Sequence, residues 1–135
     1  MMTPTSEPAR EAEPLHIAKK YVSCYNDQNY DELTAILHPR SFRFSHHNRG
    51  VYAESAAEFV ELLRRMGAEV FPDRRFTAIR SAHVFDDVVL LDTRWSGRPI
   101  VTVPGRFEAG TELVMYIKSL IVVDDGVISE IRDHN

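Results

Sequence analysis

Residues 111–135 constrain the fold more than any other stretch of the chain. A run of Val, Ile, Leu, Met and Tyr occupies positions 113–123, and β-branched and aromatic residues favour a pleated sheet. The sequence Asp-Asp-Gly follows, and its glycine, Gly126, can adopt the positive φ of a tight turn. Residues 127–133 then alternate apolar and polar side chains as a strand does, although the apolar Ile128 indicates that both faces are partly covered. This stretch therefore predicts two long strands joined by a tight turn.

The spacing of apolar residues predicts three helices ahead of most of the strands. The first spans residues 14–25 and opens with a proline, which suits the first turn of a helix. A short second helix spans 30–37, and a third spans 53–66 with Phe59 in its apolar stripe. Gly67 is placed to cap the end of the third helix.

Strands are predicted on both sides of the third helix. Residues 41–47 form one strand before it, and residues 74–85 and 88–95 form two after it. The segment 96–110 is rich in proline and glycine, so it is expected to be irregular, with a short strand at 100–103. Helices followed by a run of strands are typical of an α+β fold, with the helices on one face of an antiparallel sheet.

Length and composition indicate one domain. A chain of 135 residues with 44% apolar content can bury a substantial core. Residues 1–13 are expected to form a flexible tail, because they hold proline, hydroxyl and charged residues and no large apolar residue after the methionines. The domain is therefore predicted to span 14–135. The single cysteine, Cys24, excludes an internal disulfide.

Charge and hydropathy exclude several classes of partner. The net charge of −4 argues against a nucleic-acid-binding surface, which needs a basic patch. The doublet Arg74 and Arg75 is too short to be such a patch and is expected to lie on a solvated face. No run approaches the ~18 apolar residues of a membrane span. The N-terminus lacks the apolar core of a signal peptide, so a cytoplasmic protein with no membrane partner is expected.

Five segments carry a resemblance to a known family: AKKYVSCYNDQNYDEL at 18–33, FPDRRF at 71–76, DDVVLLDTRWSG at 86–97, GTEL at 110–113 and VDDGVISEIRD at 123–133. With the order of the elements, they resemble the nuclear transport factor 2-like superfamily and, within it, the SnoaL-like polyketide cyclases. The resemblance covers nearly everything after the expected tail. It implies a strongly curved antiparallel or mixed sheet, wrapped around three N-terminal helices into a cone with an internal pocket.

The resemblance implies that Asp133 is the acid of this pocket, because the cyclases and the limonene epoxide hydrolases carry an acid at the matching position of the last strand. A carboxylate on the concave face, beside Ile131 and aromatic side chains, would be desolvated. Desolvation raises the pKa of a carboxyl group toward the range useful for a general base. The alternative is an exposed structural aspartate at the end of a strand.

His46 is the second candidate catalytic residue. Strand alternation places it on the same face as Phe42 and Phe44. The ketosteroid isomerases carry a catalytic acid just after this strand, and the matching sequence here is Ser-His-His-Asn, so a histidine replaces the acid. Histidine can act as a base, an acid or a donor to an oxyanion near neutral pH. The alternative is a hydrogen-bonded histidine of the core.

Five aromatic residues are candidates for contacting a ligand, because aromatic side chains line apolar pockets and their polar atoms can orient a carbonyl group. The alternative for each of them is ordinary packing in the core. The five are Tyr21, Tyr25, Phe59, Trp95 and Tyr116.

The strand that holds Asp92 and Arg94 is the one on which the epoxide hydrolases carry an Arg-x-Asp pair, and the order of the two residues is reversed here. Alternation puts Thr93 and Trp95 at the positions of that pair. Asp92 and Arg94 then face the other side of the sheet, where an ion pair contributes little.

Together these residues predict a cofactor-independent lyase or isomerase of the polyketide cyclase type, acting on a small, mostly apolar or aromatic carbonyl compound. Asp133 would abstract a proton α to the carbonyl group, and His46, helped by Tyr25, would stabilise the enolate. One alternative is a non-catalytic small-molecule-binding or dimerisation module of the same fold. Another is an enzyme similar to the epoxide hydrolases.

No metal and no cofactor are expected, because the histidines do not show ligand spacing. A homodimer through the outer face of the sheet is expected instead. Residues 88–91 and 113–123 offer apolar side chains on both faces, which is more than the helices can cover. Two-fold pairing is the commonest closed arrangement, and dimers are frequent in the family that the chain resembles.

Overall fold

The computed structural model describes residues 7–135, with side chains from Glu13 onward. The first helix, α1, spans Glu7–Asp27 and continues through Pro14, so the prediction that it begins at Pro14 is wrong. A proline inside a helix removes one backbone hydrogen bond, and here that loss does not end the helix. Residues 7–13 of the expected tail are therefore helical, and residues 1–6 lie outside the described part of the chain.

The two shorter helices have side-chain caps at their N-termini. Helix α2, Tyr30–Ala35, is capped by Asn29, and helix α3, Ala56–Arg65, is capped by Ser55. Each cap accepts a backbone N–H that has no partner inside the helix. Helix α3 runs directly into a π-helical turn, Met66–Val70, so the prediction that Gly67 caps it is wrong.

Gly67 is needed for close packing rather than for a turn. A Cβ atom at this position would lie 3.3 Å from Tyr30 Oη and 3.4 Å from Arg74 Nη2. The absence of a side chain therefore lets the π-helical turn approach these two polar groups.

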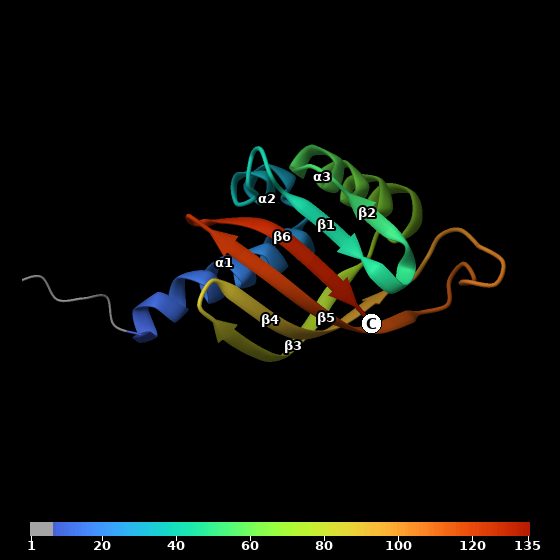
Figure 1. Ribbon diagram of the computed structural model, residues 1–135. Helices are drawn as coiled ribbons and strands as arrows, with labels where there is room; N and C mark the ends of the chain where they lie inside the picture. Colours follow the sequence, from blue (N-terminus) through green and yellow to red (C-terminus); the bar gives the residue numbers. More distant parts are fainter. Residues whose placement is uncertain (1–6) are drawn as a thin grey trace, which may run out of the picture.

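Within residues 7–135, six strands form one mixed sheet in the order β2-β1-β6-β5-β4-β3, in which only β1 and β6 run parallel (Figure 1). Strand β2 was not predicted. The strand expected at 100–103 is not formed, and the irregular segment holds only an isolated bridge between Val103 and Phe107. The strands are β1 Arg43–His46, β2 Val51–Ala53, β3 Arg75–Phe85, β4 Val88–Gly97, β5 Leu113–Asp124 and β6 Val127–His134.

A bulge in β6 explains its mixed pattern. Val122 of β5 pairs with Glu130, whereas the next residue, Val123, pairs with Ile128, so Ser129 is the extra residue. The bulge reverses the alternation at this point. Ile128 and Ile131 are consequently both buried, although an unbroken strand would place them on opposite faces.

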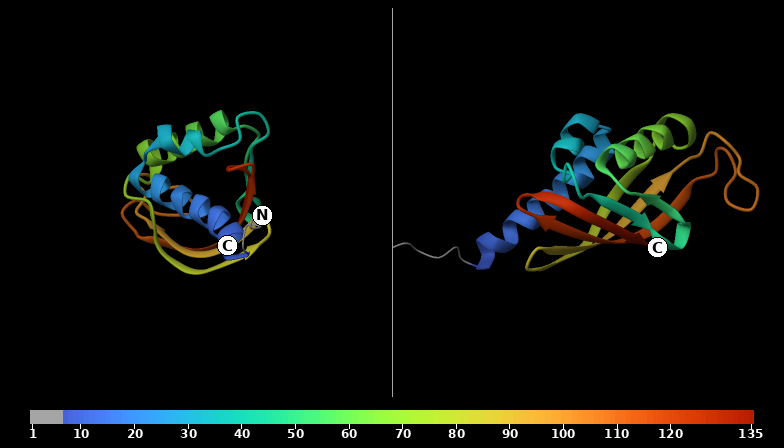
Figure 2. Two further views of the ribbon diagram at one scale, coloured as in Figure 1. Left: turned by 90° about the vertical axis from the view of Figure 1, so that its left-hand side faces the viewer. Right: turned by 45° about the horizontal axis from the view of Figure 1, so that its top comes forward.

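The sheet curls around α1, and α2 and α3 lie across the open side of the curve (Figure 2). The core lies between the helices and the concave face, with Phe59, Ile121 and Ile131 fully enclosed. This arrangement confirms the predicted cone-shaped α+β fold with three helices and a curved, open sheet.

Within residues 7–135, no helix is both long enough and apolar enough to cross a lipid bilayer.

Candidate functional site

A cavity of about 140 Å³ lies between the helices and the concave face of the sheet. Its walls are mostly apolar, and the polar groups among them come from two tyrosines, a tryptophan, a histidine and an aspartate. The residues around it are Tyr21, Tyr25, Phe44, His46, Val51, Phe59, Leu62, Leu63, Met66, Phe71, Phe76, Trp95, Met115, Ile117 and Asp133. Four of the five aromatic residues predicted to contact a ligand are in this set.

The parallel pairing of β1 with β6 brings the two candidate catalytic residues together. His46 is opposite Asp133 in the register of these strands, and both side chains are buried. This burial agrees with the inward direction predicted for His46 from strand alternation and with the pocket position that the family resemblance implied for Asp133. No sequence pattern predicted that the two residues would be neighbours.

Asp133 is only 5% exposed, and burial raises the pKa of its carboxyl group to about 7. One hydrogen bond opposes this effect, because Ser119 donates from Oγ to Asp133 Oδ1 over 2.6 Å and so stabilises the ionised form. No cation forms an ion pair with Asp133 among the described residues. The group can therefore accept and release a proton near neutral pH.

Among the described residues, the hydroxyl proton of Tyr25 has no hydrogen-bond acceptor. Trp95 donates from Nε1 to Tyr25 Oη over 2.8 Å, and an indole N–H is only a donor, so Tyr25 is the acceptor in this bond. Burial raises the pKa of Tyr25, which keeps the group protonated. Tyr25 is thus a neutral hydrogen-bond donor at the cavity wall, held in place by Trp95.

Arg74 is 1% exposed, so the prediction that it lies on a solvated face is wrong. It donates from Nη1 to the carbonyl oxygen of Tyr25 over 3.3 Å, and from Nη2 to Tyr30 Oη over 2.9 Å and to the carbonyl oxygen of Leu63 over 3.1 Å. Its guanidinium carbon lies 4.2 Å from the centre of the Tyr25 ring. The charge of Arg74 opposes part of the rise in the pKa of Tyr25.

His46 is held through Asn135, a residue that the sequence analysis did not single out. His46 Nε2 lies 2.7 Å from Asn135 Oδ1. Burial is the main cause that lowers the pKa of His46, with a smaller contribution from the charge of Arg49, whereas the bond to Asn135 opposes the shift. The neutral imidazole is therefore favoured in the fold.

The structure does not bring Tyr116 to the cavity. Met115 and Ile117 face inward from β5, so alternation turns Tyr116 outward, where it is 45% exposed. The guanidinium carbon of Arg80 lies 4.6 Å from the centre of its ring.

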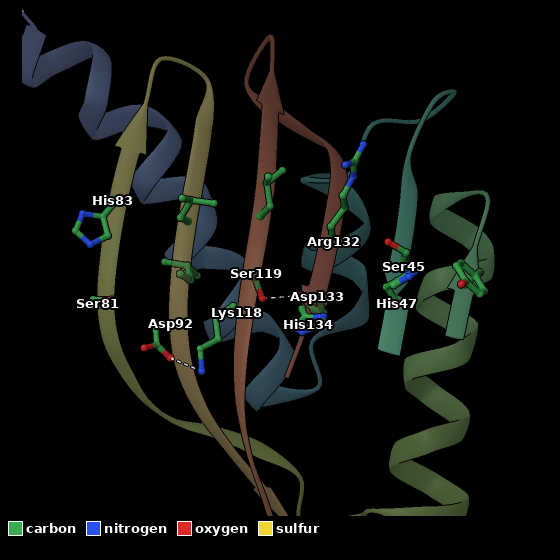
Figure 3. Close-up of a pocket in the computed structure, with 14 residues that line it drawn as sticks. Ser45, His47, Ser81, His83, Asp92, Lys118, Ser119, Arg132, Asp133 and His134 are labelled. Carbon is green, nitrogen blue, oxygen red and sulfur yellow. Dashed lines mark hydrogen bonds and ion pairs between the residues drawn. The ribbon is translucent and has the colours of Figure 1, made fainter. Parts of the chain in front are cut away.

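The outer face of the sheet carries a larger, open hollow of about 680 Å³ (Figure 3). Asp92 lies in it, 3.7 Å from Lys118 Nζ and 3.8 Å from Arg80 Nη1. Thr93 and Trp95 are buried on the opposite face, as alternation predicted. The cavity therefore lacks the Arg-x-Asp pair that the epoxide hydrolases carry on this strand.

No group of three or more His, Cys, Asp or Glu side chains that could hold a metal ion occurs in the part of the chain that the structure describes. Independence from metals remains a prediction.

Residues 18–131 match the SnoaL-like domain. No curated protein sequence matches the chain. Among solved structures, a proposed polyketide cyclase from Xanthomonas campestris superposes with a TM-score of 0.80 at 19% identity, covering 93% of this chain and 92% of that one.

Two further structures are similar. A proposed SnoaL-like polyketide cyclase from Jannaschia sp. CCS1 has a TM-score of 0.77 at 18% identity, covering 98% of this chain and 88% of that one. A proposed ketosteroid isomerase from Kribbella flavida has a TM-score of 0.69 at 14% identity, covering 92% and 78%. Likeness at such low identity shows a shared fold and leaves the chemistry to be argued from the site.

Proposed function

Because the chain belongs to the SnoaL-like domain family, we propose that it is a cofactor-independent lyase or isomerase of the polyketide cyclase type. Its substrate would be a small, mostly apolar carbonyl compound. The observation that carries the proposal is the burial of Asp133, with a pKa of about 7, at the wall of an apolar cavity. A buried acid whose pKa is shifted into the working range by desolvation is typical of proton-transfer sites.

In the proposed reaction, the ionised Asp133 removes a proton from the carbon α to the carbonyl group. The electrons of the broken C–H bond move into the carbonyl group, which becomes an enolate, and Asp133 becomes a carboxylic acid. Tyr25 donates its free hydroxyl proton as a hydrogen bond to the enolate oxygen, a donor that is already in place before the charge develops. When a C=C bond is conjugated with the enolate, Asp133 returns the proton to the far carbon of that bond, which gives an isomer. When the substrate holds a second carbonyl group, the enolate carbon attacks it and breaks its C=O π bond. The resulting alkoxide takes the proton from Asp133, which closes a ring and restores the carboxylate.

The dimensions of the cavity support a small substrate. Its volume of about 140 Å³ is below the roughly 300–1,000 Å³ of sites for drug-sized ligands. Phe44, Phe59 and Phe76 provide apolar surface for a ring system. A hydrocarbon frame with one carbonyl group would bury its apolar part here and leave its oxygen to Tyr25.

The proposal is tested first by a thermal-shift screen with ketones of increasing size, from acetophenone to steroid ketones. The compounds that raise the melting temperature are then assayed for exchange of the α-hydrogen with D₂O by NMR. Exchange catalysed by the wild-type protein and lost in Asp133→Asn supports the proposal. Binding without any exchange favours the second candidate function, a non-catalytic carrier of small molecules, which the largely apolar cavity wall would also suit.

We also propose that the protein forms a homodimer through the outer face of its sheet. Leu90 and Tyr116 are exposed on this face, at 38% and 45%, although they occupy adjacent central strands. Exposed apolar groups on central strands indicate a surface that a partner covers.

A further inference from the structure

We infer that Asn135 is a positioning residue, held by Arg49, that fixes His46 as a neutral imidazole with its proton on Nε2 and leaves Nδ1 as a proton acceptor. The hydrogen bonds place a proton on Nε2, and burial, which lowers the pKa of His46, favours the neutral ring. The part that His46 would play toward a substrate rests on the proposed function.

Arg49 determines the orientation of the Asn135 side-chain amide. Arg49 Nε lies 3.2 Å from Asn135 Oδ1, and a guanidinium nitrogen can only donate a hydrogen bond. The opposite orientation of the amide would place its NH₂ group against the Arg49 N–H, so two donors would face each other. The atom near Arg49 is therefore the oxygen.

The same oxygen determines the tautomer of His46. His46 Nε2 lies 2.7 Å from Asn135 Oδ1, which has no proton to give. Nε2 must then carry the proton and donate it. In a neutral imidazole only one ring nitrogen is protonated, so Nδ1 holds a lone pair.

Asn135 is itself fixed by the loop that follows β1. Its main-chain N–H donates to Asn48 Oδ1 over 3.2 Å, and Asn48 Nδ2 donates to the main-chain oxygen of Asn135 over 2.6 Å. Arg49 is fixed in turn, because its Nη2 donates to Met115 Sδ over 3.3 Å.

The topology explains why a residue at the end of β6 can reach His46. Strands β1 and β6 run parallel, so their C-terminal ends lie side by side. The last residue, Asn135, therefore lies beside the β1–β2 connection (Figure 1).

The assignment changes the expected role of His46. Its single proton is used in the bond to Asn135, so the neutral ring has none to give to an enolate, and that role falls to Tyr25. His46 Nδ1 makes no hydrogen bond with any described residue, and this atom is not fully buried. It can accept an O–H or N–H group of a ligand. A substrate that uses both Tyr25 and His46 Nδ1 would be a carbonyl compound that also bears a hydroxyl or enol group.

The tautomer can be measured without a substrate. Long-range ¹H–¹⁵N NMR of protein labelled with ¹⁵N at the histidine rings distinguishes a protonated ring nitrogen from a bare one. We expect His46 to show a protonated Nε2 in the wild type. Asn135→Leu should give a mixture of tautomers or move the proton to Nδ1, whereas Asn135→Asp keeps an acceptor oxygen and should keep the proton on Nε2.

His38 is a control in the same spectrum. Its Nδ1 accepts the backbone N–H groups of Arg40 and Ser41, each over 3.1 Å, so it must also carry its proton on Nε2. The His38 signals should not change in either variant of Asn135.

A wild-type His46 protonated on Nδ1, or an unchanged tautomer in folded Asn135→Leu, would overturn the inference. If Asn135→Leu does not fold, Arg49→Met is measured in its place. Arg49→Met should also allow the second tautomer of His46. An unchanged tautomer in folded Arg49→Met would equally overturn the inference.

The ligand class is tested by affinity. Acetophenone is compared with 3- and 4-hydroxyacetophenone on the wild type and on His46→Leu. At least one hydroxylated compound should bind the wild type about fivefold more tightly than acetophenone, and this preference should disappear in His46→Leu. No preference in the wild type would refute the acceptor role. Failure of every ketone to bind would count against the proposed function and leave the NMR result standing.

Discussion

The chemistry available at Asp133 depends on what surrounds its carboxyl group. The group is buried, it accepts one hydrogen bond from Ser119, and no described cation pairs with it. Desolvation therefore outweighs stabilisation of the ionised form, and the pKa rises to about 7. Asp92 has the same functional group on the opposite face, where Arg80 and Lys118 lie near it.

Asp133→Asn is expected to lower turnover by about a hundredfold or more, because the amide keeps the shape of the side chain but cannot accept the proton. Ligand affinity should change little, since the rest of the cavity wall is untouched. Steady-state kinetics with a substrate found in the ketone screen provide the measurement. Asp92→Asn is the matched control and should retain wild-type turnover. If Asp133→Asn keeps more than half of the wild-type rate, Asp133 is not the base.

The raised pKa of Asp133 also predicts how stability depends on pH. In the unfolded chain the group ionises near its ordinary pKa, so between about pH 4 and 7 the folded state binds more protons and the free energy of unfolding falls as pH rises. At pH 8 the buried charge should cost roughly 4 kcal/mol relative to a neutral group. Asp133→Asn should remove this cost.

Urea unfolding of both proteins at pH 5 and pH 8 measures the effect. The stability of Asp133→Asn relative to the wild type should increase by at least about 2 kcal/mol between the two pH values. An equal difference at both pH values would mean that the pKa of Asp133 is not raised.

Sequence patterns predicted some of these residues and not others, for a physical reason. Strand alternation was enough to place His46 on the inner face, because side-chain direction in a strand follows a period of two, and the family resemblance placed Asp133 there. Arg74 looked like a solvated residue, because a charge doublet does not reveal that the carbonyl groups of Tyr25 and Leu63 will surround it. Asn135 was missed because its role depends on a contact distant in sequence.

Among whole helices and strands, too, sequence patterns predicted some features and missed others. The three helices and the closing pair of strands were predicted, because each has a periodic pattern of its own. Strand β2, the parallel pairing of β1 with β6 and the bulge at Ser129 were not predicted. The parallel pairing joins segments distant in sequence, which no local pattern reveals, whereas β2 is only three residues long and the bulge is one extra residue in a hairpin. The site depends on one of them, since the parallel pairing sets His46 opposite Asp133.

The end of strand β4 offers a test of how the sheet supports Tyr25. A Cβ atom at Gly97 would lie 3.0 Å from Phe71 Cδ1 and 3.0 Å from Trp95 Cη2, and both rings are buried. Gly97→Ala should therefore cost about 1–3 kcal/mol of stability through overpacking. It should also weaken the bond from Trp95 to Tyr25, so turnover should fall while Asp133 is unchanged.

Ser96→Ala is the neighbouring control and should alter stability by no more than about 0.5 kcal/mol. Urea unfolding and turnover of both variants test the prediction. Wild-type stability in Gly97→Ala would show that the two rings can move aside without cost.

At the scale of the whole molecule, the fold divides its polar groups between two faces of one sheet. The concave face encloses Asp133, His46 and Tyr25 with apolar groups, which provides the low-dielectric surroundings that shift their pKa values. The outer face places Asp92 and Lys118 beside exposed apolar residues in an open hollow (Figure 3). A second copy seated on this face would cover those apolar groups without closing the cavity.

The proposed homodimer predicts a specific effect of one substitution. Leu90→Glu places a charge on the outer face of β4, so in a two-fold arrangement it would bury one unpaired carboxylate from each copy. Light scattering coupled to size-exclusion chromatography should report a dimer for the wild type at micromolar concentration and a monomer for Leu90→Glu. Val101→Glu is the control, because Val101 is 40% exposed on the segment between β4 and β5 and should leave the dimer intact. A monomeric wild type would refute the proposed dimer. A dimeric Leu90→Glu would show that the dimer interface does not lie on this face of the sheet.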